Sequence, residues 1–208
     1  MIRFALLGLA LLCAAPARAR TATDAVKSAN DKLRDALDVF VKAKGDERKT
    51  ARDQVRAAVD SLLDFDELVE GAAGRHWKEM SPEQRTRFRD ALRGVMEANY
   101  LVKGQAEAGG VDLSKVRSDY LGEEKQDNGT VRVKTRLHAG DDSAEVDYVL
   151  KRKKGIWHAV DVVTEGASLV ETYREQIDTL WPKKQYEGVV STLERKRKQL
   201  EARLDKTE

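Results

Sequence analysis

Residues 146–174 constrain the fold more than any other part of this 208-residue chain. Apolar side chains stand at every second position at the start of the segment, which is the spacing of a strand with one buried face: Val146, Tyr148 and Leu150. A polar turn follows at residues 153–155, and a second apolar run returns through residues 156–163. Ser168 then stands where it can cap a helix. The segment therefore predicts a β-hairpin whose apolar face meets an amphipathic helix that carries Leu169, Val170 and Tyr173.

The first hundred residues have the periodicity of helices. Apolar residues fall at helical spacing in residues 25–44 and again in residues 46–63, so we expect two amphipathic helices that form a hairpin. A short helix is expected at residues 65–73. A third long helix should begin at Ser81, which forms a capping box with Gln84. Its apolar positions include Phe88, Leu92, Met96 and Tyr100.

After a loop that contains Gly104, Gly109 and Gly110, apolar residues no longer fall at helical spacing. They alternate with polar residues instead, as in a strand. We expect a sheet to begin near Lys115. Its second strand places cations on one face and apolar residues on the other, among them Val131, Val133 and Leu137. Asn128 and Gly129 predict the turn before this strand. The pattern contains no repeat or linker, so residues 20–208 are expected to form one α+β domain.

Residues 1–19 have the pattern of a secretory signal peptide, with a basic start, a short apolar run and small residues at Ala17 and Ala19. The run is shorter than the roughly 20 apolar residues that span a bilayer, so we expect cleavage after Ala19. The one cysteine, Cys13, lies in this leader. The exported chain would therefore be stabilised by an ordinary core and not by disulfides.

The charge balance and the residue inventory argue against several classes of function. The leader contains two of the 38 basic residues, which leaves 36 against 36 acidic residues, whereas nucleic-acid-binding proteins usually have a basic excess. The sequence has three scattered histidines and neither a zinc-protease helix motif nor a Gly-rich phosphate loop. His76 is interpreted as a structural residue. We therefore predict no enzymatic activity, no metal, no cofactor and no nucleic-acid partner.

Two acidic residues, Asp147 and Asp161, stand next to apolar residues on neighbouring strands. A carboxylate that is even partly buried needs a partner, and Arg75 and Arg174 are the predicted partners. We favour a structural ion pair over a catalytic pair of carboxylates.

The basic run at residues 195–198 lies in a last helix predicted at residues 184–206. Its main interpretation is a solvated helix face. A second hypothesis is that these cations contact anionic lipid head groups or an acidic partner.

Three segments together resemble the MlaC family of periplasmic phospholipid-binding proteins, also called the toluene-tolerance family. The first segment begins with a V-D-Y-x-L strand at residues 146–150, followed by Gly155 and Trp157. It continues with a D-V-x-x-E-G-x-S-L-V element and then Tyr and Arg, within residues 161–174. Residues 64–77, DFDELVEGAAGRHW, are similar to a second family segment, and residues 185–193 to its closing helix.

The resemblance implies a curved antiparallel sheet of about four strands, packed against several helices and enclosing an apolar pocket. The pocket would hold the acyl chains of a phospholipid as cargo, with the head group toward solvent. Periodicity alone leaves open whether the same residues are simply core. The predicted lining residues are Phe88, Leu92, Met96, Tyr100, Val133, Leu137, Val146, Tyr148, Leu150, Leu169, Val170 and Tyr173.

The resemblance also implies a function. The expected protein is a monomeric periplasmic carrier that shuttles phospholipids between an inner-membrane ABC transporter complex with an MCE-domain protein and an outer-membrane lipoprotein complex, so that the outer membrane keeps its lipid asymmetry. The alternative hypothesis is a periplasmic protein-interaction or chaperone-like module without a lipid cavity.

Overall fold

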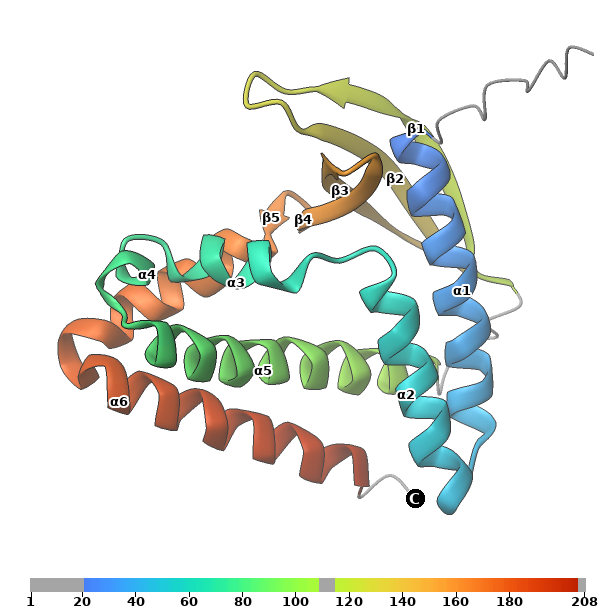
Figure 1. The fold of residues 1–208 in the computed structure, drawn as a ribbon. Helices are drawn as coiled ribbons and strands as arrows, with labels where there is room; N and C mark the ends of the chain where they lie inside the picture. The colour runs from blue at the N-terminus through green and yellow to red at the C-terminus, as the bar shows by residue number, and fades with distance from the viewer. Residues whose placement is uncertain (1–20, 109–114, 206–208) are drawn as a thin grey trace, which may run out of the picture.

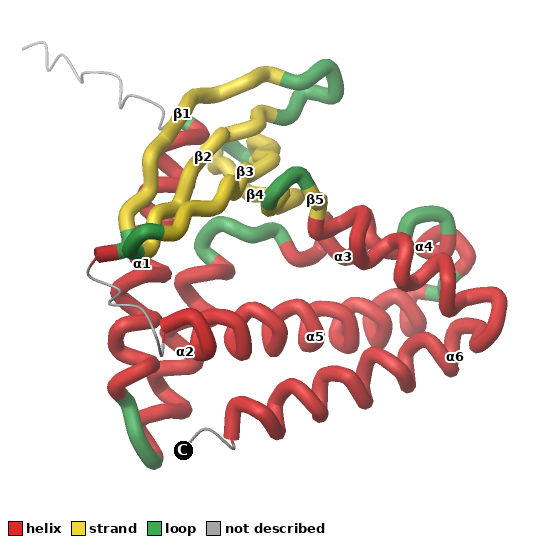
Figure 2. The backbone as a smooth tube through the Cα atoms, turned by 180° about the vertical axis from the view of Figure 1, so that it is seen from behind, coloured by secondary structure: helices red, strands yellow, loops and turns green. Residues whose placement is uncertain are grey.

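The computed structural model describes residues 21–108 and 115–205, and the predicted signal peptide lies outside them. A sheet lies on one side of a layer of helices, and α1 runs alongside both (Figure 1). Figure 2 shows the same two parts from behind. In chain order, the elements are α1 Ala22–Lys42, α2 Asp46–Asp60, α3 Phe65–Ala73, α4 His76–Glu79, α5 Pro82–Ala108, β1 Arg117–Lys125, β2 Val131–Ala139, β3 Asp142–Lys153, β4 Ile156–Thr164, β5 Ala167–Ser168 and α6 Leu169–Asp205.

The sequence signals for helix starts are confirmed in the structure. The backbone N–H of Gln84 donates to Ser81 Oγ at 3.2 Å, and the N–H of Ser81 donates to Gln84 Oε1 at 2.9 Å, which completes the predicted capping box of α5. At the start of α6, the N–H of Glu171 donates to Ser168 Oγ at 3.0 Å. These caps fix where two of the longest helices begin.

The sheet is antiparallel, with its strands in the order β1-β2-β3-β4-β5. The four expected strands are present, and the two-residue β5 adds a fifth. The β3–β4 turn contains Lys154 and Gly155, both at positive φ, which is the geometry of a tight two-residue hairpin. Backbone hydrogen bonds also join residues 62–64 to β4, where the N–H of Asp64 donates to Ala159 O at 2.9 Å.

The last helix consists of two helical parts. Gln185 has φ 55° and ψ −179°, a non-helical conformation that follows Pro182 by three residues. The second part corresponds to the predicted final helix, and it runs back beside α5 (Figures 1 and 2). None of the helices in the described ranges is long and apolar enough to cross a bilayer.

The buried apolar residues form three clusters. The helix cluster joins α3, α5 and α6 around Phe65, Leu68, Phe88, Leu92, Met96, Val170 and Tyr173. The sheet cluster joins Val131, Val133, Val146, Tyr148, Leu150 and Ala159 to Leu62 and to Ala22, Val26 and Ala29 of α1. The hairpin cluster joins Phe40, Val55, Leu101 and Leu204, from α1, α2, α5 and the end of α6. The core is thus divided between the sheet, the helical layer and the α1–α2 hairpin.

The predicted partners of Asp147 and Asp161, Arg75 and Arg174, are wrong. Asp147 Oδ2 lies 3.5 Å from Arg132 NH1 on the neighbouring strand. Asp161 accepts hydrogen bonds from Ser168 Oγ at 2.6 Å and from the backbone N–H of Val170 at 3.1 Å. Because the start of α6 presents unpaired backbone N–H groups beside β4, the Asp161 carboxylate is satisfied there without an arginine.

The two arginines have other partners. Arg174 donates to the carbonyl oxygen of Gly71 through Nε at 2.9 Å and through NH2 at 2.7 Å, so it ties α6 to α3. Arg75 NH2 lies 3.4 Å from Asp178 Oδ1. Arg174 therefore connects two helices and Arg75 connects the α3–α4 turn to α6, so neither pairs with the sheet carboxylates.

Candidate functional site

Five of the predicted lining residues share the apolar face of the sheet: Val133, Leu137, Val146, Tyr148 and Leu150. Val133 pairs with Tyr148 across β2 and β3, so their side chains lie on the same face. Val133 and Leu150 are fully buried, and Leu137 is partly buried. The small residues of α1, Ala22, Ala25 and Ala29, pack against this face together with Val26. This part of the predicted site is thus covered by the first helix.

A polar bridge fixes α1 on the sheet. The hydroxyl of Tyr148 donates to Asn30 Oδ1 at 2.9 Å, and Asn30 Nδ2 donates to the hydroxyl of Tyr120 at 3.3 Å. Burial raises the pKa of Tyr148 to about 12, against the opposing effect of its hydrogen bond with Asn30. The bridge joins α1 to β1 and β3 through one amide group. It holds the helix in one register on a face that is mostly apolar.

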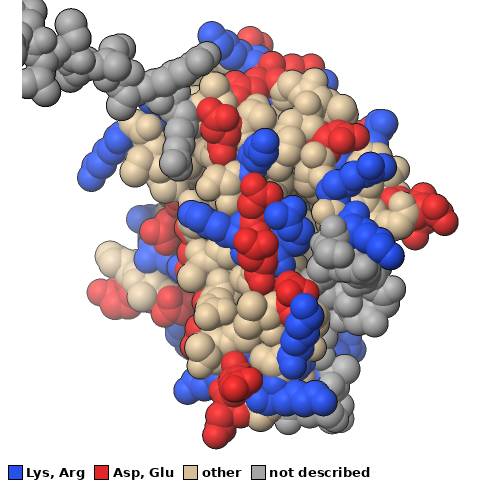
Figure 3. Space-filling model, turned by 90° about the vertical axis from the view of Figure 1, so that its right-hand side faces the viewer, with Lys and Arg blue, Asp and Glu red and all other residues tan. Residues whose placement is uncertain are grey.

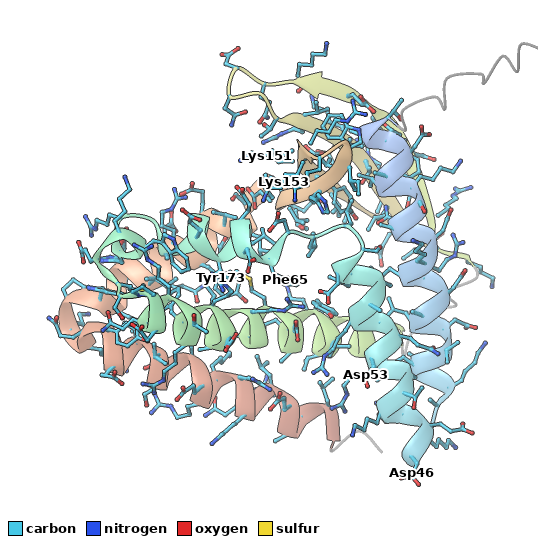
Figure 4. The ribbon with its side chains drawn as sticks, viewed as in Figure 1. Asp46, Asp53, Phe65, Lys151, Lys153 and Tyr173 are labelled. Carbon is cyan, nitrogen blue, oxygen red and sulfur yellow. The ribbon has the colours of Figure 1, made fainter. Side chains whose placement is uncertain are left out.

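Six other predicted residues belong to the helix cluster: Phe88, Leu92, Met96, Leu169, Val170 and Tyr173. Phe88 and Leu92 are fully buried in α5. Tyr173 and Phe65 lie between α3 and α5 (Figure 4). Asn99 Nδ2 donates to the hydroxyl of Tyr173 at 2.7 Å, and burial raises the pKa of Tyr173. This part of the predicted site therefore has its own well-packed interior.

Tyr100 differs from the other predicted residues because it lies between two clusters. Its ring packs against both the helix cluster and the hairpin cluster. Its hydroxyl is buried and has no hydrogen-bond partner among the described residues. Burial is the main cause of a raised pKa at this hydroxyl, and the nearby carboxylates of Glu97 and Asp60 add to it. An unsatisfied buried hydroxyl is a polar group that a ligand can stabilise.

The sheet cluster and the helix cluster meet at residues 62–64, which we call the seam. Leu62 belongs to the sheet cluster, and Leu63 packs against both clusters. Asp64 caps α3 by accepting from the backbone N–H of Glu67 at 3.1 Å. The seam is therefore the point at which the sheet and the helical layer share apolar contacts.

Charged side chains close the seam on the side of the β3–β4 hairpin. Lys153 Nζ lies 2.5 Å from Asp64 Oδ2 and 2.8 Å from Glu67 Oε1, and Lys151 Nζ lies 3.2 Å from the same Glu67 oxygen. Figure 4 shows Lys151 and Lys153 near α3. The hydrogen bond to Asp64 is the largest cause that raises the pKa of Lys153, to about 12. Burial opposes the ionisation of Asp64, yet Lys153 and the Glu67 N–H outweigh it, so the pKa of Asp64 is lowered.

The structure does not bring the twelve predicted residues into one cluster. The sheet face packs on α1, whereas the predicted residues of α5 and α6 belong to the helix cluster. The sequence analysis did not predict the contact between the two clusters at the seam, nor the packing of α1 on the sheet. The available signal was the spacing of Ala22, Ala25 and Ala29, because small residues at helical spacing let a helix approach a sheet closely.

Two grooves of about 450 Å³ each lie on the α1–α2 hairpin. Both are lined by Val39 and Gln54, and charged residues of both signs surround them, including Lys32, Asp35 and Lys42. Figure 3 shows cations and anions interleaved over the side of the molecule where this hairpin lies. These grooves are not the predicted apolar pocket, which stays a prediction.

The described residues contain no group of three or more His, Cys, Asp or Glu side chains that could hold a metal ion. His76 is buried and stacks on Trp181 with ring centroids 4.0 Å apart. Its Nε2 lies 2.8 Å from Asp178 Oδ1. These contacts agree with the structural role predicted for His76, because they join α4 to α6.

Comparison with known proteins identifies the family. The family model described as "MlaC protein" matches residues 27–195. The chain belongs to the MlaC family. The match to MlaC includes all three segments on which the resemblance was based and runs from α1 into the second part of α6. Membership also agrees with the prediction that this MlaC-family chain is not an enzyme.

The MlaC-family fold has a solved counterpart. The chain is similar to the phospholipid-binding protein from Ralstonia solanacearum, whose structure was determined in complex with a phospholipid. The TM-score is 0.71 at 21% sequence identity, and the alignment covers 87% of this chain and 99% of the other. Almost the whole of that protein therefore shares the fold. No curated protein matches the chain.

Proposed function

We propose that this protein is a periplasmic carrier that binds a phospholipid and moves it between membrane complexes. One observation carries the proposal: the fold is shared over almost the full length of a protein whose structure contains a bound phospholipid. We further propose that residues 1–19 are removed on export and that residues 20–208 act as one domain. The carrier is expected to function as a monomer.

The physical need for such a carrier follows from the hydrophobic effect. Each methylene withdrawn from water is worth ~0.8 kcal/mol, so two acyl chains with roughly 30 methylenes would cost about 24 kcal/mol to expose. A protein that moves a phospholipid through an aqueous compartment must therefore enclose both chains.

The proposed lipid site lies where the sheet cluster and the helix cluster meet. Separation of the two clusters around the seam would expose apolar surface on both sides while each cluster stays packed within itself. Five predicted lining residues lie on the sheet side of the seam and six on the helix side, whereas Tyr100 lies between the helix cluster and the hairpin cluster. A lipid oxygen near Tyr100 would satisfy its buried hydroxyl.

The proposed partners come from the family. The carrier would receive or deliver lipid at an inner-membrane ABC transporter complex that contains an MCE-domain protein. It would exchange lipid with an outer-membrane lipoprotein complex at the other side of the periplasm. This exchange would help the outer membrane to keep its lipid asymmetry.

The deciding experiment is native mass spectrometry of the protein purified from the periplasm, followed by organic extraction and identification of the lipid. We expect a complex with phospholipid at a defined stoichiometry. A variant with Leu150→Asp should be lipid-free, and circular dichroism should establish that it is folded. If the wild-type protein is lipid-free and takes up no lipid from vesicles, the alternative function, a protein-interaction module, replaces the carrier.

A further inference from the structure

The turn between β3 and β4 combines exposed charge with an exposed apolar side chain. We call residues 151–157 the hairpin tip. Four successive cations, Lys151 to Lys154, precede Gly155, and Ile156 follows it. The side chain of Ile156 is 61% exposed, the largest exposure of any large hydrophobic residue in the described ranges. An exposed isoleucine beside four cations calls for an explanation in terms of a partner.

Two cations of the hairpin tip have carboxylate partners and two do not. Lys151 and Lys153 pair with Asp64 and Glu67 on the side of α3. Arg152 lies over the ring of Trp157 at 5.7 Å and donates to the carbonyl oxygen of Gly155. Lys154 is exposed and forms no ion pair within residues 21–108 and 115–205. The tip therefore keeps a net positive charge next to Ile156.

The cations of β2 show no such excess. They are matched across the strands: Arg132 with Asp147, Lys134 with Glu124 and Arg136 with Glu145. Cross-strand pairs of opposite charge stabilise a sheet and leave little field for an outside partner. The cations of β2 are thus compensated by carboxylates, whereas the tip retains a positive excess.

We propose that the hairpin tip docks on the surface of an anionic lipid bilayer. Lys154 and Arg152 contact lipid phosphates, and Ile156 enters the boundary between head groups and acyl chains. A bilayer fits this feature because the apolar residue directly follows an exposed two-residue turn, with cations beside it in place of an apolar rim. Interfaces between proteins usually have the opposite arrangement, an apolar centre surrounded by polar groups.

The docking geometry rests on the proposed carrier function and adds to it. Lys153 joins the hairpin tip to Asp64 in the seam. A bilayer that contacts Lys154 and Ile156 is therefore close to the place where the sheet and helix clusters meet. Docking by the tip would bring the proposed lipid site to the membrane edge-on, so that a lipid passes between the clusters with little exposure to water.

The test is co-sedimentation of the full protein with two kinds of vesicle. One contains phosphatidylglycerol and phosphatidylethanolamine in equal parts, and the other contains phosphatidylcholine alone. We expect binding to the anionic vesicles, reduced by added salt. Lys154→Asn removes the charge while keeping a residue that tolerates positive φ, and it should weaken binding about fivefold. Ile156→Thr should weaken it several-fold.

The matched control is Lys49→Gln, which removes one exposed cation from α2 and should leave vesicle binding unchanged. Equal loss in this control would overturn the proposal, because binding would then follow net charge alone. Absence of a preference for anionic vesicles, or binding only when an acidic protein is added, would overturn it as well. Native mass spectrometry separates this result from the carrier function, since Lys154→Asn should still hold its lipid.

Discussion

Lys153 of β3 donates a hydrogen bond to the carboxylate of Asp64, the residue that caps α3, with Nζ and Oδ2 2.5 Å apart. One side chain of the sheet thus contacts the N-terminus of α3. The same lysine contacts Glu67, so both carboxylates share its charge. This small network holds the hairpin tip against the seam.

The network should make the stability of the wild-type protein fall in acid. The pKa values of Asp64 and Glu67 are lowered from their ordinary values of 3.8 and 4.5. The stability that these groups contribute is therefore present above about pH 4.5 and is lost as the pH falls through the lowered folded-state values. Urea unfolding at a series of pH values should show this decline. Partial exposure of Lys153 limits the contribution of the network to about 1 kcal/mol.

The control for this prediction is Asp64→Asn, which keeps a good cap for α3 but removes the charge. This variant should be less stable than wild type near pH 7, and the difference should shrink as the pH falls below 4. A constant difference at all pH values would mean that the cap, and not the ion pair, is affected.

The attachment of α1 to the sheet should depend on the bridge through Asn30. Tyr148→Phe removes the donor to Asn30 Oδ1 and should lower the free energy of unfolding by about 1 kcal/mol. A double-mutant cycle with Asn30→Ala measures the coupling directly. If the two changes are additive, the hydrogen bond contributes nothing and α1 is held by apolar contacts alone.

Tyr100→Phe should separate stability from lipid binding. The hydroxyl of Tyr100 is buried without a partner in the described residues, so its removal should leave stability unchanged or raise it by up to about 1 kcal/mol. If a bound lipid supplies the missing partner, the same variant should hold lipid less tightly in a competition with empty vesicles. A loss of stability instead would mean that the hydroxyl is already satisfied in the lipid-free protein.

Two helical glycines offer opposite outcomes for the same substitution. A Cβ at position 71 would lie 3.0 Å from Cγ1 of the buried Val170, whereas a Cβ at position 94 would meet only the flexible side chain of Arg197. Gly71→Ala should therefore destabilise the contact between α3 and α6. Gly94→Ala should raise the melting temperature, since alanine favours a helix over glycine by up to about 1 kcal/mol. Thermal unfolding followed by circular dichroism distinguishes the two cases, and equal effects of both substitutions would contradict the argument.

Local features of this fold could be predicted from the sequence because their causes are local. The bounds of α3, the cap at Ser81 and the turn at Gly155 each follow from a few neighbouring residues. Periodicity also identified the apolar face that contains Val133. It shows that a side chain is buried, however, and not which element buries it, so the packing of α1 on the sheet was missed.

The long-range polar contacts could not be predicted from the sequence for a similar reason. Asp161 was expected to need an arginine, but it is satisfied by backbone N–H and hydroxyl groups at the start of α6. Arg174 was expected to reach the sheet, but the carbonyl of Gly71 is its partner. Choosing between such partners requires the relative placement of a helix and a strand, which residue spacing does not contain.

The change of direction in α6 at Gln185 affects the order in which the parts of the core can form. The second part of that helix carries Leu204 back to the hairpin cluster, where it is buried with Phe40 and Val55 near the other end of the chain. Residues separated by most of the sequence therefore share one interior. The hairpin formed by α1 and α2 lacks a part of its core until the last helical turn has been synthesised. A chain that ended before that turn would leave Phe40 and Val55 without the contribution of Leu204 to their shared interior.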